Sequence, residues 1–158
     1  MMIDWTSTAD MLVRLTAASV LGALLGVERQ LHGRWAGLRT HMMVALGSAI
    51  FIAAGVDLTR ARSEAAAASL GDATRVIQGI AAGIGFLGAG TILKLTDRLE
   101  IKGLTTASSI WLSAAVGAAS GLALYPLAIA GTLISLVVLA VLRPLEKRFE
   151  RENHLPPK

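Results

Sequence analysis

Apolar and polar residues occur along this chain in long blocks. Five segments are almost wholly apolar: residues 8–27, 38–56, 76–93, 104–122 and 125–142. Each approaches the ~20 residues that a helix needs to cross a hydrocarbon core of about 30 Å. The last two segments are either two helices, with Pro126 in the first turn of the second, or one long kinked helix. The pattern predicts an all-α polytopic membrane protein with about five transmembrane helices.

The charges between these segments predict an orientation. Lys and Arg are in excess in residues 28–39, 94–103 and 143–158, which lie on the same side if there are five spans. Lys and Arg favour cytoplasmic loops, so we expect the N-terminus outside and the C-terminus inside. Residues 57–75 then form an outer loop of balanced charge, part of which we expect to be a short helix. Residues 1–142 would be the transmembrane domain, and residues 143–158 a short cytoplasmic tail.

Composition supports a membrane protein and excludes several other classes. The chain is 54% hydrophobic and 16% charged, and it has no cysteine, so disulfides and thiolate metal sites are excluded. The three histidines lack the spacing of a zinc site, and no P-loop or Ser/His/Asp arrangement is present. The basic residues sit in short loops between apolar segments. We therefore predict no metal, cofactor, nucleic-acid partner or enzymatic activity, and no cleaved signal peptide.

The third apolar segment is rich in glycine. Its glycines are Gly79, Gly83, Gly85, Gly88 and Gly90. In lipid, glycine lets another helix approach closely, so we interpret these positions as helix-packing residues. On a helix, Val76, Ile80, Ile84 and Leu87 would share a side suited to lipid. We expect a homodimer or a higher homo-oligomer within the lipid bilayer.

Hydroxyl side chains form a stripe along the fourth segment, at helical spacing. The stripe comprises Thr105, Ser108, Ser109, Leu112, Ser113, Gly117 and Ser120. One interpretation is helix packing, with each hydroxyl bonded to its own backbone. The other is a polar lining for a ligand or an ion route.

Charged residues within or next to apolar segments are costly and therefore informative. Arg14 lies four residues after Asp10, which permits an ion pair on one helix face. Asp72 and Arg75 lie three residues apart at the start of the third segment.

A weak internal repeat suggests a second group of charges. Shifting the sequence by 66 residues aligns Gly37-Leu38 with Gly103-Leu104 and places Glu28 opposite Lys94. We expect Glu28, Lys94 and Arg39 to form a charged cluster at the cytoplasmic rim, unless these side chains simply mark the lipid–water boundary.

Several motifs together resemble the MgtC/SapB family of bacterial inner-membrane proteins. They are Gly26-Val-Glu28-Arg29-Gln30, Ala36-Gly37-Leu38-Arg39-Thr40-His41, Asp72-x-x-Arg75-Val76, the run Gly83-Ile-Gly85-Phe86-Leu87-Gly88-Ala89-Gly90-Thr91-Ile92, Lys94, and Gly103-Leu104-Thr105-Thr106-Ala107-Ser108-Ser109-Ile110-Trp111. The resemblance covers roughly residues 20–130. Some family members carry a soluble C-terminal domain, which we do not expect in residues 143–158.

The resemblance implies a non-enzymatic, multi-pass regulator in the bacterial inner membrane. It further implies links to magnesium homeostasis, acid tolerance and survival inside macrophages. A known member of the family restrains ATP synthase through its membrane sector, so the resemblance also implies ATP synthase as a possible partner. A small Mg²⁺ carrier or channel is the alternative. The candidate functional or ligand-binding residues are Glu28, Arg29, Arg39, Thr40, Asp72, Arg75, Gln78, Lys94, Thr105, Thr106, Ser108, Ser109 and Trp111.

Overall fold

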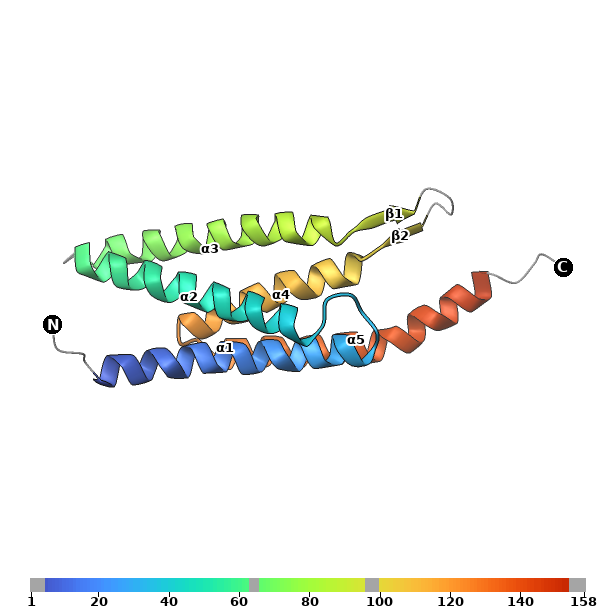
Figure 1. The fold of residues 1–158 in the computed structure, drawn as a ribbon, viewed down its shortest axis with the longest axis horizontal. Coiled ribbons are helices and arrows are strands. Elements are labelled where there is room, and N and C mark those ends of the chain that lie inside the picture. The colour runs from blue at the N-terminus through green and yellow to red at the C-terminus, as the bar shows by residue number, and fades with distance from the viewer. Residues whose placement is uncertain (1–4, 63–65, 96–99, 154–158) are drawn as a thin grey trace.

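In the part of the chain that it describes, the structure is a bundle of five helices with one short β-ribbon (Figure 1). This computed structural model describes the backbone of residues 5–62, 66–95 and 100–153, and the side chains of residues 8–56, 74–92 and 102–142. The helices are α1 (Trp5–Leu31), α2 (Leu38–Arg62), α3 (Ala66–Gly90), α4 (Leu104–Gly121) and α5 (Tyr125–Asn153). The predicted all-α class is confirmed.

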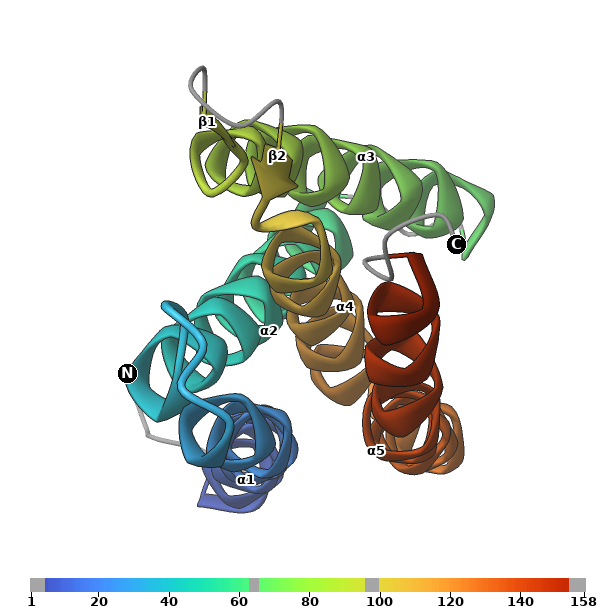
Figure 2. The same cartoon turned by 90° about the vertical axis from the view of Figure 1, so that its right-hand side faces the viewer.

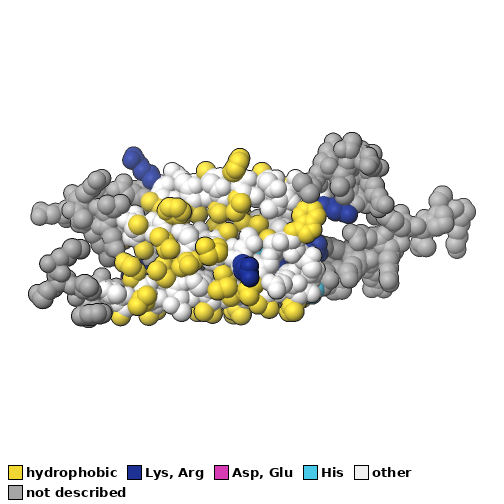
Figure 3. All heavy atoms as spheres, viewed as in Figure 1, with side chains coloured by type: hydrophobic (Ala, Val, Ile, Leu, Met, Phe, Trp, Pro, Cys, Tyr) yellow, Lys and Arg dark blue, Asp and Glu magenta, His cyan; other side chains and the backbone are white. Residues whose placement is uncertain are grey.

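Three of these helices contain stretches long and apolar enough to cross a membrane. By length and composition, and within the described residues, they are Thr8–Leu31, Leu38–Val56 and Tyr125–Leu142. On the face drawn in Figure 3, hydrophobic side chains cover much of the middle of the molecule. These features are those of a membrane protein, while the count of five spans and the orientation stay predictions.

The helices extend further than the apolar segments. Helix α1 continues to Leu31, so Glu28 and Arg29 lie in a helix and not in the predicted loop. The predicted outer loop 57–75 is wrong, because α2 continues to Arg62 and α3 begins at Ala66. Helix α5 likewise runs past residue 142 to Asn153. Glu, Arg and Lys are good helix formers, so a fall in hydropathy does not end a helix.

The two connections that were hardest to judge from sequence have defined structures. Leu122–Leu124 separate α4 from α5, with Ala123 in a left-handed conformation (φ 59°), so the single kinked helix is wrong. In place of the expected loop 94–103, the structure has β1 (Leu93–Leu95) and β2 (Glu100–Lys102), which pair antiparallel. Gly103 follows with φ 97°, and a Cβ there would lie 2.0 Å from the carbonyl oxygen of Thr91. Only glycine fits this tight return into α4.

Helix α4 lies at the centre and contacts all four other helices (Figure 2). Its closest approach is to α2, where a Cβ on Gly117 would lie 2.1 Å from the Ala45 carbonyl oxygen. Val116 and Ala119 of α4 form the hydrophobic core with Leu25 of α1 and Ala128 of α5. Small residues therefore set the spacing of the bundle, as expected for helices in lipid.

Helix α3 lies at the edge of the bundle, against α2 and α4 (Figures 1 and 2). Among the residues that the structure describes, a Cβ added at Gly79, Gly83, Gly85 or Gly90 would meet no atom within 4 Å. Gly88 differs, since a Cβ there would lie 3.6 Å from Ala107. The expected faces are partly wrong, because Val76, assigned to lipid, packs against Gly55 of α2.

Candidate functional site

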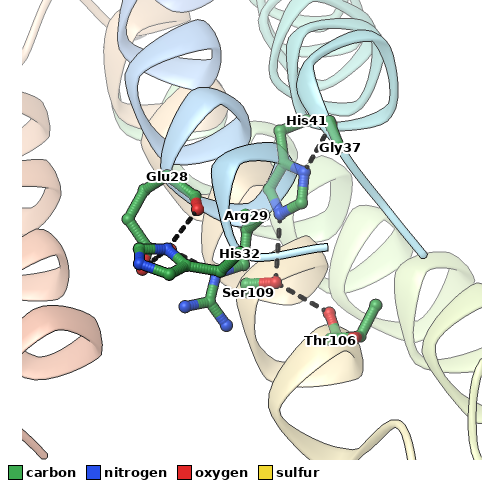
Figure 4. A network of polar contacts seen from close by, with 7 residues as sticks. All are labelled: Glu28, Arg29, His32, Gly37, His41, Thr106 and Ser109. Carbon is green, nitrogen blue, oxygen red and sulfur yellow. Dashed lines mark hydrogen bonds and ion pairs between the residues drawn. The ribbon is translucent and has the colours of Figure 1, made fainter. Parts of the chain in front are cut away.

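An ionic cluster of Glu28, Arg29 and His32, of which Arg29 is buried, lies in the last turns of α1 (Figure 4). The Arg29 side chain is only 2% exposed, and its Nε donates a hydrogen bond to Glu28 Oε2. The Nδ1 atom of His32 lies 2.7 Å from the Glu28 carbonyl oxygen and 2.9 Å from Glu28 Oε1. One carboxylate therefore serves two basic side chains.

A second group of polar contacts joins α2 to α4 beside this cluster (Figure 4). His41 is fully buried, with Nδ1 2.9 Å from the Gly37 carbonyl oxygen and Nε2 3.0 Å from Ser109 Oγ. Ser109 Oγ also lies 2.9 Å from the carbonyl oxygen of Thr106. A carbonyl oxygen only accepts, so Nδ1 of His41 carries the hydrogen. The contact thus holds the start of α2 against α4, and it joins two residues that are 68 positions apart in the sequence.

Two buried atoms of the ionic cluster lack a hydrogen-bond partner among the described residues. They are Arg29 Nη1 and Glu28 Oε1. Oε1 is close enough to His32 for an ion pair, but their geometry is not that of a hydrogen bond. An unsatisfied buried polar atom costs roughly 1–3 kcal/mol, so packing alone does not explain the cluster. Buried ionisable groups within a membrane helix are functional candidates for this reason.

The structure brings together four of the candidates chosen from sequence: Glu28, Arg29, Thr106 and Ser109. Arg39 is exposed, and the Glu28 carboxylate contacts Arg29 and His32 instead of it. Thr40 is half-buried in α2. The other described candidates are exposed along α3 and α4: Arg75, Gln78, Thr105, Ser108 and Trp111. The side chains of Asp72 and Lys94 lie outside the described residues.

Sequence reasoning missed His32 and His41, because it considered the histidines only as zinc ligands and found that their spacing does not fit a zinc site. His41 was part of a quoted motif and lies in an apolar segment, where a titratable side chain is costly. The sequence could therefore have identified His41 as a candidate. It could not have identified the contact with Ser109, because that contact depends on how α2 packs against α4.

Arg14 forms a second polar contact, between α1 and the end of α4. Its guanidinium pairs with Asp10, as predicted, and Nη1 donates a 3.0 Å hydrogen bond to the Gly121 carbonyl oxygen. Arg14 therefore ties α1 to the connection between α4 and α5.

Three described hydroxyls of α4 bond to their own helix. Ser108, Ser109 and Ser120 donate to the carbonyl oxygens of Leu104, Thr106 and Val116, and only Ser113 Oγ is buried without a partner among the described residues. This arrangement matches the helix-packing interpretation of the stripe.

An apolar groove of about 610 Å³ lies between α2 and α3. Gly47, Gly79 and Gly83 line it together with Phe51 and Ile80. A smaller hollow of about 370 Å³ lies between α3 and α4, beside Gly88, Ser108 and Trp111. In the described part of the chain, no three His, Asp or Glu side chains are grouped to hold a metal ion.

The long apolar helices, together with an ionic pair whose arginine is buried, indicate a helical membrane protein. The family model described as "MgtC family" matches residues 15–148, so the chain belongs to the MgtC family. The predicted family resemblance is confirmed. No solved structure matches the chain.

This chain matches different shares of the length of three relatives. Protein SrpB of Synechococcus elongatus is 39% identical over 91% of this chain and 79% of its own length. The "Putative magnesium transporter YhiD" of Escherichia coli K12 is 37% identical over 93% of this chain and 67% of its own. Protein MgtC of Salmonella typhimurium is 39% identical over 92% of this chain and 56% of its own. The chain therefore spans between about half and four fifths of each relative.

Proposed function

We propose that this protein is a non-enzymatic regulator of the bacterial inner membrane, linked to magnesium homeostasis, acid tolerance and survival inside macrophages. It acts by packing against another membrane protein, and the membrane sector of ATP synthase is the proposed partner. Family membership and the name of the Escherichia coli relative, a putative magnesium transporter, support the magnesium link. We further propose that the chain crosses the membrane five times, with its N-terminus outside and its C-terminus inside, and that it forms a homo-oligomer.

The groove between α2 and α3 carries the proposal. Its walls are apolar, and a Cβ on Gly47, Gly79 or Gly83 would meet no atom of the described residues within 4 Å. Glycine at such positions lets the backbone of another helix approach closely, and lipid-embedded helices associate chiefly through such packing. The occupant we propose is a transmembrane helix of the regulated protein.

The alternative is a small Mg²⁺ carrier or channel. The buried Ser113 hydroxyl and Glu28 Oε1, both without a hydrogen-bond partner in the described residues, favour it. Mg²⁺ is usually held by one or two carboxylates and several waters. Here the carboxylate of Glu28 is already engaged by Arg29 and His32, and the Ser109 and Ser120 hydroxyls of α4 are bonded to their own helix. These contacts support the regulator over the carrier.

A groove-filling variant tests the proposal. Gly79→Leu combined with Gly83→Leu places two side chains in the groove, while Gly131→Leu is the matched control, because its position on α5 also meets no atom within 4 Å. We expect the groove variant to lose growth at limiting Mg²⁺ and to lose co-purification of the ATP synthase membrane sector. The control should keep both.

Two measurements complete the test. Liposomes containing the purified protein and an Mg²⁺-sensitive dye should show no flux above empty liposomes. Saturable flux that Glu28→Gln abolishes would establish the carrier instead. The native mass of the wild type and of Gly83→Leu in mild detergent tests whether a second copy of this chain occupies the groove. If it does, Gly83→Leu should reduce the size of the assembly.

A further inference from the structure

Two exposed arginines flank the groove between α2 and α3. The described residues that line this groove are uncharged. On α2, Arg39 lies one helical turn before Met43, which lines the groove and is 67% exposed. On α3, Arg75 lies one turn before Gly79, which lines the opposite wall. Residues four positions apart are neighbours on one face of a helix, so each arginine lies at the rim of the groove.

The two arginines lie at opposite ends of the groove, because α2 and α3 run in opposite directions (Figure 1). Val76, next to Arg75, packs against Gly55, near the end of the apolar stretch Leu38–Val56 of α2. Arg39 is at the start of the same stretch. At 1.5 Å of rise per residue, Arg39 and Gly55 are separated by roughly 24 Å along α2. This distance is close to the thickness of a hydrocarbon core, about 30 Å.

Membrane orientation accounts for only one of these two charges. In the proposed orientation Arg39 is on the cytoplasmic side, where Lys and Arg are favoured, whereas Arg75 is on the outer side, where they are not. The ion pairs found among the described residues involve neither side chain, and both side chains are exposed. A guanidinium in such a position can bind a carboxylate through two parallel hydrogen bonds. The rim therefore presents a site for an acidic group at each end of the groove.

We infer that the helix that docks in this groove carries an acidic side chain near each of its ends and small residues between them. A separation of roughly 24 Å corresponds to about sixteen residues of that helix. The small residues face Gly47, Gly79 and Gly83, where the backbones approach most closely. An acidic side chain at the edge of an apolar helix is costly unless it finds a cation, so the two arginines select helices that carry both acids. The inference rests on the proposed function, because it takes the groove as the docking site.

A synthetic transmembrane helix provides the test. The Asp peptide consists of leucine and alanine, with glycine at its centre and two aspartates about sixteen residues apart. Its sequence is symmetric, so either direction of insertion places an aspartate at each end. Matched peptides carry asparagine instead, or two aspartates half as far apart. Binding is measured in phosphatidylcholine liposomes by energy transfer from a donor on Trp35→Cys, a position that is 66% exposed in a chain without cysteine.

We expect the Asp peptide to bind at least tenfold more tightly than the asparagine peptide. Arg39→Gln and Arg75→Gln should each weaken binding of the Asp peptide about fivefold, as for a partly solvated ion pair. They should change binding of the asparagine peptide less than twofold, because each effect is a coupling between two charges. The peptide with closely spaced aspartates reaches only one arginine at a time and should bind about fivefold more weakly than the Asp peptide. Arg34→Gln, at an exposed arginine in the connection between α1 and α2, is the matched control and should have no effect.

The groove-filling variant separates this inference from the proposed function. If Gly79→Leu combined with Gly83→Leu abolishes binding while the Asp and asparagine peptides bind equally well, the inference is overturned and the groove remains the docking site. If the Asp peptide still binds the groove-filling variant, or does not bind the wild type, both are overturned. An effect of Arg34→Gln as large as that of Arg39→Gln would indicate general attraction between charges and would also overturn the inference.

Discussion

The contact between α2 and α4 gives a sharp test of the fold, because a single methyl group should disrupt it. A Cβ on Gly117 would lie 2.1 Å from the Ala45 carbonyl oxygen and 2.6 Å from its Cα. These neighbours are backbone atoms and cannot rotate away. The two helices would therefore have to separate by about an ångström to restore even a tight contact of 3.0 Å.

The expected free-energy change of Gly117→Ala follows from three effects. Overpacking costs about 1–3 kcal/mol. The Cα–H of Gly117 that points at the carbonyl oxygen forms a weak hydrogen bond worth about 0.5–1 kcal/mol, which is lost. Alanine gains about 1 kcal/mol of helix propensity. Because the clash is with backbone, the upper part of the range applies, and we expect a net loss of about 3 kcal/mol in the free energy of unfolding.

Other glycines provide controls with the same chemical change. Gly131→Ala meets no atom within 4 Å, so its only effect is a gain of up to about 1 kcal/mol. Gly121→Ala, whose Cβ would lie 2.9 Å from the Ala49 carbonyl oxygen, should fall between them, and Gly88→Ala, at 3.6 Å from Ala107, should resemble Gly131→Ala.

Reversible unfolding in mixed micelles, followed by circular dichroism, measures the four values. If Gly117→Ala is as stable as Gly131→Ala, α2 and α4 do not approach as described.

Three further variants probe the polar contacts by the same measurement. Glu28→Gln removes the carboxylate partner of the buried Arg29 and should destabilise the protein by about 3–5 kcal/mol; an unchanged stability would mean that the guanidinium is solvated. Ser109→Ala leaves a buried ring nitrogen without its partner and should cost roughly 1–3 kcal/mol, whereas Ser108→Ala, on the exposed side of α4, should be close to neutral; equal effects would place the two hydroxyls in similar surroundings. Arg14→Gln should cost about 1.5–3 kcal/mol through the lost hydrogen bond to the end of α4, and the absence of any effect would refute that contact.

The five helices could be predicted from sequence because long apolar blocks have few alternatives in lipid. The residues at which the helices end could not be predicted in this way. Glu28 and Arg29 were assigned to a loop because they are charged, yet they pair with each other within α1 and extend it to Leu31. Hydropathy reports where lipid would cover a helix, whereas the helix itself continues as long as its residues find partners.

The sequence predicted which charged residues belong to the candidate site, but it did not predict which side chains they contact. Glu28 and Arg29 stand out because ionisable residues next to an apolar segment are costly. The choice of Arg39 as the partner of Glu28 relied on closeness along the chain. The structure instead turns Arg39 outward and brings His41 against Ser109 of α4, a contact between residues 68 positions apart. Only the packing of α2 against α4 determines that pair.

The glycines show why a motif alone does not identify a contact. Gly79-x-x-x-Gly83 was interpreted as a packing motif, while Gly117 was noted only as part of a hydroxyl stripe. In the folded chain Gly117 makes the tightest contact between α2 and α4, and Gly79 and Gly83 face open space. Glycine in a helix interior costs stability in both places, and at Gly117 the close packing offsets that cost. At Gly79 and Gly83 no contact with the described residues offsets that cost, which is the physical reason to look for a helix from another molecule in that groove.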